Sequence, residues 1–225
     1  MKKRRESLTP VMHAHVLKAC LALTITSLGF LLADFTANGL GHWYLAWNLF
    51  LAWVPVSFAI LCIRMAYERG WGSWQTIAAF LLWLGFLPNT FYIITDYIHL
   101  FDSSKSSPLF NVALFGIFAI TGMALGLYAL YIVHRRLAKI WSPLQTNVFI
   151  AATLAACSFA VYLGRVLRWN TWDILINPAG ILFDVSDRLI DPERHPETIA
   201  TTCTFFALLG GLYIATWLLG QGSDE

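Results

Sequence analysis

The sequence predicts an all-α integral membrane protein with six transmembrane helices and with its N- and C-termini in the cytoplasm. The first observation is composition: of 225 residues, 58% are hydrophobic and 12% are charged, and the mean hydropathy is +0.62. A soluble domain carries about twice that charged fraction. The second observation is that the apolar residues form long runs, and the third is that basic residues gather in alternate connections.

Six apolar runs approach or exceed the roughly 20 residues that one helix needs to cross a bilayer. Because they are continuous and lack a two-residue alternation, they predict helices rather than the strands of a barrel. The predicted spans are residues 16–33, 43–63, 75–94, 109–134, 147–167 and 198–220. They form a single membrane domain, residues 16–220, between a basic cytoplasmic tail, residues 1–15, and a short cytoplasmic tail, residues 221–225.

The first run could also be read as a signal peptide, because four basic residues precede it at positions 2–5. The apolar stretch is long for a signal peptide, and no small-x-small cleavage site is evident near Asp34. We therefore expect a retained span.

The charges of the connections predict the orientation, because Lys and Arg are held on the cytoplasmic side of a membrane. Ten basic residues fall on the side of the termini and five on the other side, where acidic residues accompany them. The ten are Lys2, Lys3, Arg4, Arg5, Lys18, Arg64, Arg69, Arg135, Arg136 and Lys139, and the five are Lys105, Arg165, Arg168, Arg188 and Arg194. Nothing in this pattern resembles a nucleic-acid-binding patch.

The interiors of the predicted spans are free of strongly polar chemistry. No Asp, Glu, Lys or Arg lies near the centre of a span, where ion-coupled transporters commonly place such residues. The four cysteines fall inside spans without a paired spacing, so we expect them to act as small apolar residues. Small residues recur at four-residue spacing, which predicts close helix packing: Gly122 with Gly126, Ala151 with Ala155, Ala152 with Ala156, and Ala207 with Gly211.

The first polar stretch is LPNTFYIITDYIHL, residues 87–100, at the outer end of the third span. At 100° per residue, Asn89, Tyr92, Asp96 and His99 fall within about 80° of one another, so they share one face of a helix. Pro88 removes a backbone donor and disfavours helical dihedrals at the residue before it. This predicts a kink, or a break followed by a helix that restarts with Pro88 in its first position and aims backbone donors at an anion.

The second polar stretch is GRVLRWNTWD, residues 164–173, where the chain leaves the fifth span. If the helix continues, Arg165, Arg168 and Trp172 share one face, and Asp173 lies to one side. Two guanidinium groups three residues apart could clamp a carboxylate or phosphate. They could equally neutralise Asp96 and Asp173.

These two stretches together, on a chain of this length and span count, resemble the bacterial membrane protein family catalogued as domain of unknown function 1361. The likeness extends from the second predicted span through the sixth. The family pattern has Ala-Pro at Thr90-Phe91 and Ser at Thr171. The resemblance implies a multi-pass protein of the bacterial cytoplasmic membrane and supplies no activity or cofactor. It implies that the signature residues are Pro88, Asn89, Asp96, His99, Arg165, Arg168, Asn170, Trp172 and Asp173.

The two stretches predict one outer-facing polar site with two competing interpretations. As an enzyme site, His99 would act as acid or base, Asp96 would orient it, and an anionic lipid or isoprenoid phosphate headgroup would bind. Asp96 and His99 could also hold a divalent metal, with Asp102 or Asp173 completing its ligands. The substrate-binding candidates are Asn89, Tyr92, Arg165, Arg168, Asn170, Trp172 and Asp173. In the alternative, a partner-binding or solute-passage protein, the same residues form a structural ion-pair network. Membrane lipids are the expected partners in either case.

The long connection after Asp173 is predicted to carry a short amphipathic helix. After Pro178, the residues Ile181, Leu182, Val185 and Leu189 share one face at helical spacing. We expect this helix to lie on the outer leaflet, either as a flap that closes the end of the bundle or as a lid over the polar site.

Overall fold

The structure is a computed structural model that describes residues 11–100, 106–169 and 173–221, and every element in this part of the chain is helical. The long helices are α1 (Val11–Asn38), α2 (Trp43–Arg69), α5 (Pro108–Leu137), α6 (Pro143–Arg165) and α9 (Pro196–Gln221). The third predicted span is divided into α3 (Trp74–Phe86), α4 (Pro88–Tyr92) and the 3-10 helix η2 (Ile93–His99). The shorter elements are η1 (Gly39–His42), α7 (Asp173–Ile176), α8 (Pro178–Ile190) and η3 (Pro192–Arg194).

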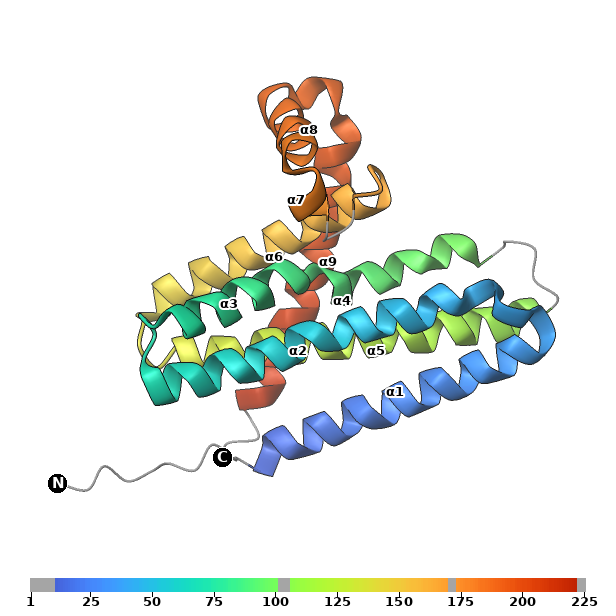
Figure 1. The fold of residues 1–225 in the computed structure, drawn as a ribbon, viewed down its shortest axis with the longest axis horizontal. Coiled ribbons are helices and arrows are strands. Elements are labelled where there is room, and N and C mark those ends of the chain that lie inside the picture. Colours follow the sequence, from blue (N-terminus) through green and yellow to red (C-terminus); the bar gives the residue numbers. More distant parts are fainter. Residues whose placement is uncertain (1–10, 101–105, 170–172, 222–225) are drawn as a thin grey trace.

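The all-helical prediction is confirmed, and each predicted span coincides with a long helix or with the α3–η2 series. Within the described residues, five helical stretches are long and apolar enough to cross a membrane. The first of them, Ala14–Arg69, contains both α1 and α2, which fold back on each other at η1 (Figure 1). These are the five to six long apolar helices of a multi-pass membrane protein.

Three helices start at a Ser cap that the sequence supplies directly. The Ser73 hydroxyl accepts a hydrogen bond from the Thr76 backbone at the start of α3. Ser107 does the same for α5, with Pro108 in the first position. At α6, Ser142 and Gln145 form a reciprocal capping box. These caps satisfy backbone N–H groups that have no partner inside the helix, so they fix where each helix begins.

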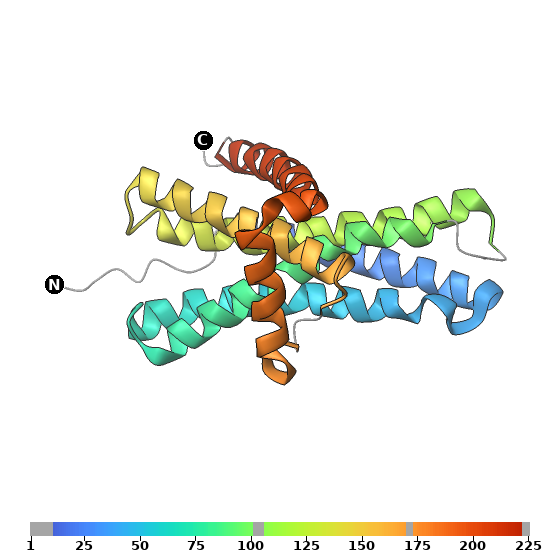
Figure 2. The same ribbon diagram turned by 90° about the horizontal axis from the view of Figure 1, so that it is seen from above.

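The long helices form an elongated bundle that α9 crosses. Figures 1 and 2 show α1 and α3 running opposite to α2 and α5 along the long axis. Both views show α9 crossing at a steep angle, and it packs mainly on α6 and α5. At that crossing the His134 imidazole stacks on Trp217 with centroids 3.8 Å apart, and its Nδ1 lies 2.6 Å from the Tyr213 hydroxyl.

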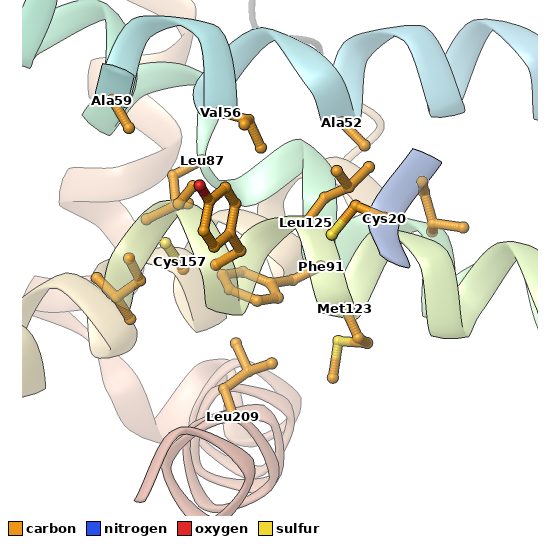
Figure 3. Close-up of a cluster of buried hydrophobic side chains, with 14 of the residues drawn as sticks. Cys20, Ala52, Val56, Ala59, Leu87, Phe91, Met123, Leu125, Cys157 and Leu209 are labelled. Atoms are coloured by element: carbon orange, nitrogen blue, oxygen red, sulfur yellow. The ribbon is translucent and has the colours of Figure 1, made fainter. Parts of the chain in front are cut away.

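The core lies around α5, and the Gly122 and Gly126 pair lets α4 approach it. A Cβ at Gly122 would lie 2.6 Å from the Thr90 carbonyl oxygen, and one at Gly126 would overlap the Thr90 hydroxyl and the Phe91 ring. The predicted packing role of this pair is therefore confirmed. Figure 3 shows Leu87 and Phe91 among core side chains from α2, α5 and α9.

The other small-residue pairs do not make such contacts within the described residues. On α6, Ala151, Ala152 and Ala156 are exposed, and on α9 both Ala207 and Gly211 are exposed. The expectation that these pairs pack inside the bundle is wrong for this chain alone, because α6 and α9 turn these faces outward.

Candidate functional site

The third membrane segment is interrupted between α3 and α4, just before Pro88, and changes to a 3-10 helix at Ile93, and this course positions the first polar stretch. The predicted restart is confirmed, because α3 ends at Phe86 and α4 begins with Pro88 in its first position. The expectation that Leu87 leaves helical dihedrals is wrong: its φ of −54° and ψ of −40° are helical. Leu87 is fully buried in the core and its N–H bonds to the Trp83 carbonyl, which holds it in helical geometry despite the following proline.

The start of α4 does not present free donors as a restarted helix was expected to do. The Thr90 N–H donates to the Leu87 carbonyl at 3.1 Å, and the Thr90 hydroxyl donates to the same oxygen at 2.7 Å. The Asn89 amide donates to the Phe86 carbonyl at 3.0 Å. These bonds join α3 to α4 across the proline, so an anion would have to be bound by side chains.

The central feature of the site is a buried ion pair between η2 and α6. Arg165 Nη2 donates to Asp96 Oδ1 at 2.6 Å, and the side chains are 18% and 4% exposed, respectively. The second oxygen of the Asp96 carboxylate accepts from the Asn48 amide of α2 at 2.9 Å. One carboxylate therefore links three segments that are far apart in the sequence.

Arg165 is fixed by further contacts with the third segment. Its Nε donates to the Thr95 hydroxyl at 2.7 Å, and its guanidinium lies over the Tyr92 ring, 4.5 Å from the centroid. The end of α6 can lie this close to Tyr92 because Gly164 has no side chain. A Cβ at Gly164 would lie 3.1 Å from the Tyr92 ring. A guanidinium has five N–H donors, and two are used here. The remaining donors have no hydrogen-bond partner in the part of the chain that the structure describes.

A cavity of about 320 Å³ lies beside this ion pair. It brings together both polar stretches, since Asn89, Tyr92, Asp96, His99 and Arg165 all line it, as the sequence predicts for one site. The other residues that line it are Tyr44, Trp47, Asn48, Leu51, Gly85, Pro88, Ala160, Val161, Leu163, Gly164, Trp169 and Ile181. Its volume lies at the lower end of the range of about 300–1,000 Å³ for small-molecule pockets.

His99 lies at the end of η2 and faces the cavity. Three residues per turn place it on the same face as Asp96, so the 3-10 helix preserves the predicted stripe. Its ring meets Tyr44 edge to face, with centroids 5.6 Å apart. The Asp96 carboxylate is held by Arg165 and Asn48.

The second polar stretch is not a continuous helix, although a continuous helix is what would place Arg165, Arg168 and Trp172 on one face. The helix α6 ends at Arg165, and Arg168 adopts a left-handed φ of 61°. The Trp169 N–H then donates to the Leu163 carbonyl at 3.2 Å, which turns the chain back over the end of the helix. Arg168 is exposed and is not part of the cavity wall, although its charge acts on the Tyr92 hydroxyl.

The remaining predicted site residues lie beyond this turn. Asn170 and Trp172, like Asp102 from the metal hypothesis, lie outside the described residues. Asp173 begins α7 and is not among the residues that line the cavity. Within the described ranges, no group of three or more His, Cys, Asp or Glu side chains could hold a metal ion.

The predicted amphipathic helix is present as α8, and one side of it covers the cavity. Ile181 lines the cavity, and the Trp169 indole N–H donates to the Asp184 carboxylate at 2.7 Å. Arg188 Nε donates to the Tyr162 hydroxyl of α6 at 3.2 Å. The predicted apolar face is divided, however, because Ile181 faces the cavity whereas Leu182 is 64% exposed. Two further apolar residues of α8, Phe183 and Ile190, are also exposed.

A second polar cluster lies at the C-terminal end of α1, next to η1. Asp34 is fully buried, its Oδ2 lies 2.8 Å from His42 Nδ1, and its Oδ1 accepts from the Asn38 amide at 2.6 Å. The His42 ring meets the ring of Tyr44, which lines the cavity. These residues form a cluster of their own, which meets the site through the aromatic contact between His42 and Tyr44.

Several site residues have no local signal in the sequence. Thr95 and Gly164 act through contacts with residues about 70 positions away, which periodicity cannot reveal. Trp47 and Trp169 also line the cavity, although Trp near the ends of spans is ordinarily typical of a membrane interface.

Comparison with known proteins supports the resemblance found in the sequence. The model of a family described as "Protein of unknown function (DUF1361)" matches residues 47–211, which include both polar stretches and every described residue that lines the cavity except Tyr44. No curated protein and no solved structure matches the chain.

Proposed function

The chain belongs to the DUF1361 family, whose description assigns no activity, and we propose from its site that it binds the headgroup of an anionic lipid or isoprenoid phosphate. The observation that carries this proposal is the cavity beside Arg165. A guanidinium held at a fixed position with unused N–H donors is suited to a phosphate or carboxylate. Asn89 and His99 supply further polar groups on the opposite wall.

We place the cavity at the outer face of the bacterial cytoplasmic membrane, with six spans and both termini inside. The ends of α2 and α5 and the starts of α1, α3 and α6 share one end of the molecule, and Arg64, Arg69, Arg135, Arg136 and Lys139 lie there (Figure 1). The last turn of α9 lies toward the same end. Basic residues are retained on the cytoplasmic side. The cavity lies away from this basic end, beside η2, so we place it facing outward.

Arg165 is partly neutralised by Asp96, so binding of an anion depends on a second cation. Arg168, three residues after Arg165, would supply this charge, because it is exposed and has no ion pair within the described ranges. In the enzymatic form of the proposal, His99 serves as the acid or base and Asp96 positions Arg165. The headgroup would bind between Arg165 and His99.

The second candidate function is a non-enzymatic protein in which the ion pair is purely structural. The observation that favours it is that both Asp96 oxygens are engaged by side chains from α2 and α6. A buried carboxylate bound in this way fixes the arrangement of three helices. This alternative requires no ligand in the cavity.

The test is native mass spectrometry of the protein released from mild detergent, with lipid analysis of what remains bound. Asp96→Asn/Arg165→Gln removes both charges together, so no unpaired charge is left buried. Arg64→Gln is the matched control, because Arg64 is exposed at the opposite end. We expect an anionic lipid on the wild type and on the control and none on the double variant. Equal lipid on all three, or none on the wild type, overturns the proposal.

A further inference from the structure

The cavity is polar at one end and apolar at the other. Along α2 the lining residues change from Tyr44, Trp47 and Asn48 to Leu51, deeper in the membrane segment. Along the third segment they change from His99 and Asp96 at the outer end to Pro88 and Gly85.

The wall contributed by α6 has the same gradient. Arg165 lies at the outer end, and Val161 and Ala160 lie one turn or more deeper. At a rise of about 1.5 Å per residue as far as Ile93 and about 2.0 Å per residue in η2, His99 and Gly85 are separated by roughly 24 Å of helical chain. The deepest lining residues, which define the deep half, are Leu51, Gly85, Pro88, Ala160 and Val161, none of which has a charged or hydrogen-bonding side chain, and Asn89, next to Pro88, marks the border with the polar half.

Because Gly85 has no side chain, the deep half of the cavity is open to the exterior of the helix bundle at this position. It lies inside α3, where glycine costs about 0.5–1 kcal/mol relative to alanine. An added Cβ at Gly85 meets no atom within 4 Å, and the residue is exposed. Helix packing therefore does not require glycine here, unlike at Gly122 and Gly126. What glycine provides is open space between α3 and α6, on the surface of an apolar span.

We propose that the deep half binds the first part of the hydrocarbon chain of the ligand, which reaches the site from the bilayer beside Gly85. This inference rests on the proposed function and specifies its ligand: a lipid bound by headgroup and chain together, rather than a water-soluble anion. The total volume of about 320 Å³ accommodates a small headgroup and a few carbons, so the rest of the chain remains in the membrane.

The test measures binding of inorganic phosphate and of n-alkyl phosphates of one to eight carbons to the full-length protein in lipid nanodiscs. If successive methylenes enter the deep half, affinity rises by about fourfold for each until that half is full. Gly85→Leu fills this space without meeting another residue at its Cβ, and Gly85→Ala is the milder variant that favours the helix. Gly211→Leu is the matched control, because Gly211 is also in a helix with open space around it.

We expect the wild type and Gly211→Leu to show the same dependence on chain length, after partitioning into empty nanodiscs is subtracted. Gly85→Leu should bind methyl phosphate as the wild type does but gain nothing from longer chains, with Gly85→Ala in between. Chain dependence that persists in Gly85→Leu overturns this inference and leaves headgroup binding intact. Absence of binding of every phosphate to the wild type overturns the proposed function and this inference with it.

Discussion

The Asp96–Arg165 pair determines what the site can do at the level of single residues. Because Asp96 accepts from both Arg165 and Asn48, the carboxylate is held as an anchor for the guanidinium. Arg165 is then fixed over Tyr92, where its remaining donors are oriented before any ligand arrives. A side chain held in this way loses little entropy on binding.

Removing one member of this pair is expected to destabilise the protein more than removing both. Arg165→Gln leaves a carboxylate that is 4% exposed without its charge partner, which costs about 3–5 kcal/mol. Asp96→Asn/Arg165→Gln should recover most of this loss, as measured by thermal unfolding in one detergent. A double variant no more stable than Arg165→Gln alone would contradict this reading of the pair.

His99 is the residue whose substitution separates binding from chemistry. In the enzymatic form of the proposal, His99→Ala lowers turnover of the bound lipid by about 10²–10⁴-fold, the usual contribution of a general acid or base. Lipid binding should weaken far less than turnover, because Arg165, which carries the main contact with the headgroup, is untouched. The control is His15→Ala, an exposed histidine near the start of α1. Unchanged turnover in His99→Ala would remove His99 from any catalytic role.

At the scale of elements, the contact between α4 and α5 holds the restarted helix in place. Gly122→Ala puts a Cβ 2.6 Å from the Thr90 carbonyl oxygen, so backbone must move. We expect a loss of about 1–3 kcal/mol, the usual cost of overpacking, in thermal unfolding. Gly29→Ala on α1 meets nothing within 4 Å and should not lower stability. Equal effects of the two variants would argue against a special role for the α4 contact.

The helix α8 is predicted to be held over the cavity by the Trp169–Asp184 hydrogen bond. Asp184→Ala removes this acceptor, which is worth about 0.5–1.5 kcal/mol. Hydrogen exchange of α8 amides should then rise roughly two- to tenfold, while α3 amides remain unchanged. Asp191→Ala, which breaks the exposed pair with Arg194, is the control. A uniform rise in both variants would show that α8 is not fixed by this bond.

Sequence patterns predicted elements well where the cause is local. Continuous apolarity predicted the long helices, and the missing N–H of Pro88 predicted the break between α3 and α4. The end of α6 at Arg165 could not be predicted in this way, because it depends on the left-handed backbone at Arg168, a residue type with no preference for it. The partners Asn48 and Thr95 were found only in the fold, since they meet the site across long sequence separations.

At the scale of the whole molecule, the scarce charges have two distinct locations. The basic residues of the connections that follow α2 and α5 gather at one end, and the site residues lie along η2 and at the C-terminal end of α6. The steep crossing of α9, seen in Figures 1 and 2, leaves most of that helix exposed, which suits contact with lipid.

The orientation can be tested by cysteine labelling in intact cells. Lys139→Cys, at the basic end, and Glu193→Cys, in η3, are both exposed positions. With the four native cysteines replaced by alanine, we expect a membrane-impermeant maleimide to label Glu193→Cys directly. Lys139→Cys should be labelled only after permeabilisation. The reverse pattern would invert the topology and turn the cavity toward the cytoplasm.

The central claim is that the cavity beside Arg165 holds an anionic headgroup. The most direct measurement is a high-resolution structure of the protein extracted in native membrane patches, without added lipid. The account predicts a phosphate or carboxylate within hydrogen-bond distance of Arg165 and a hydrocarbon chain leaving past Gly85. A cavity that holds only water, with Arg165 bound to Asp96 and Thr95 alone, would contradict it.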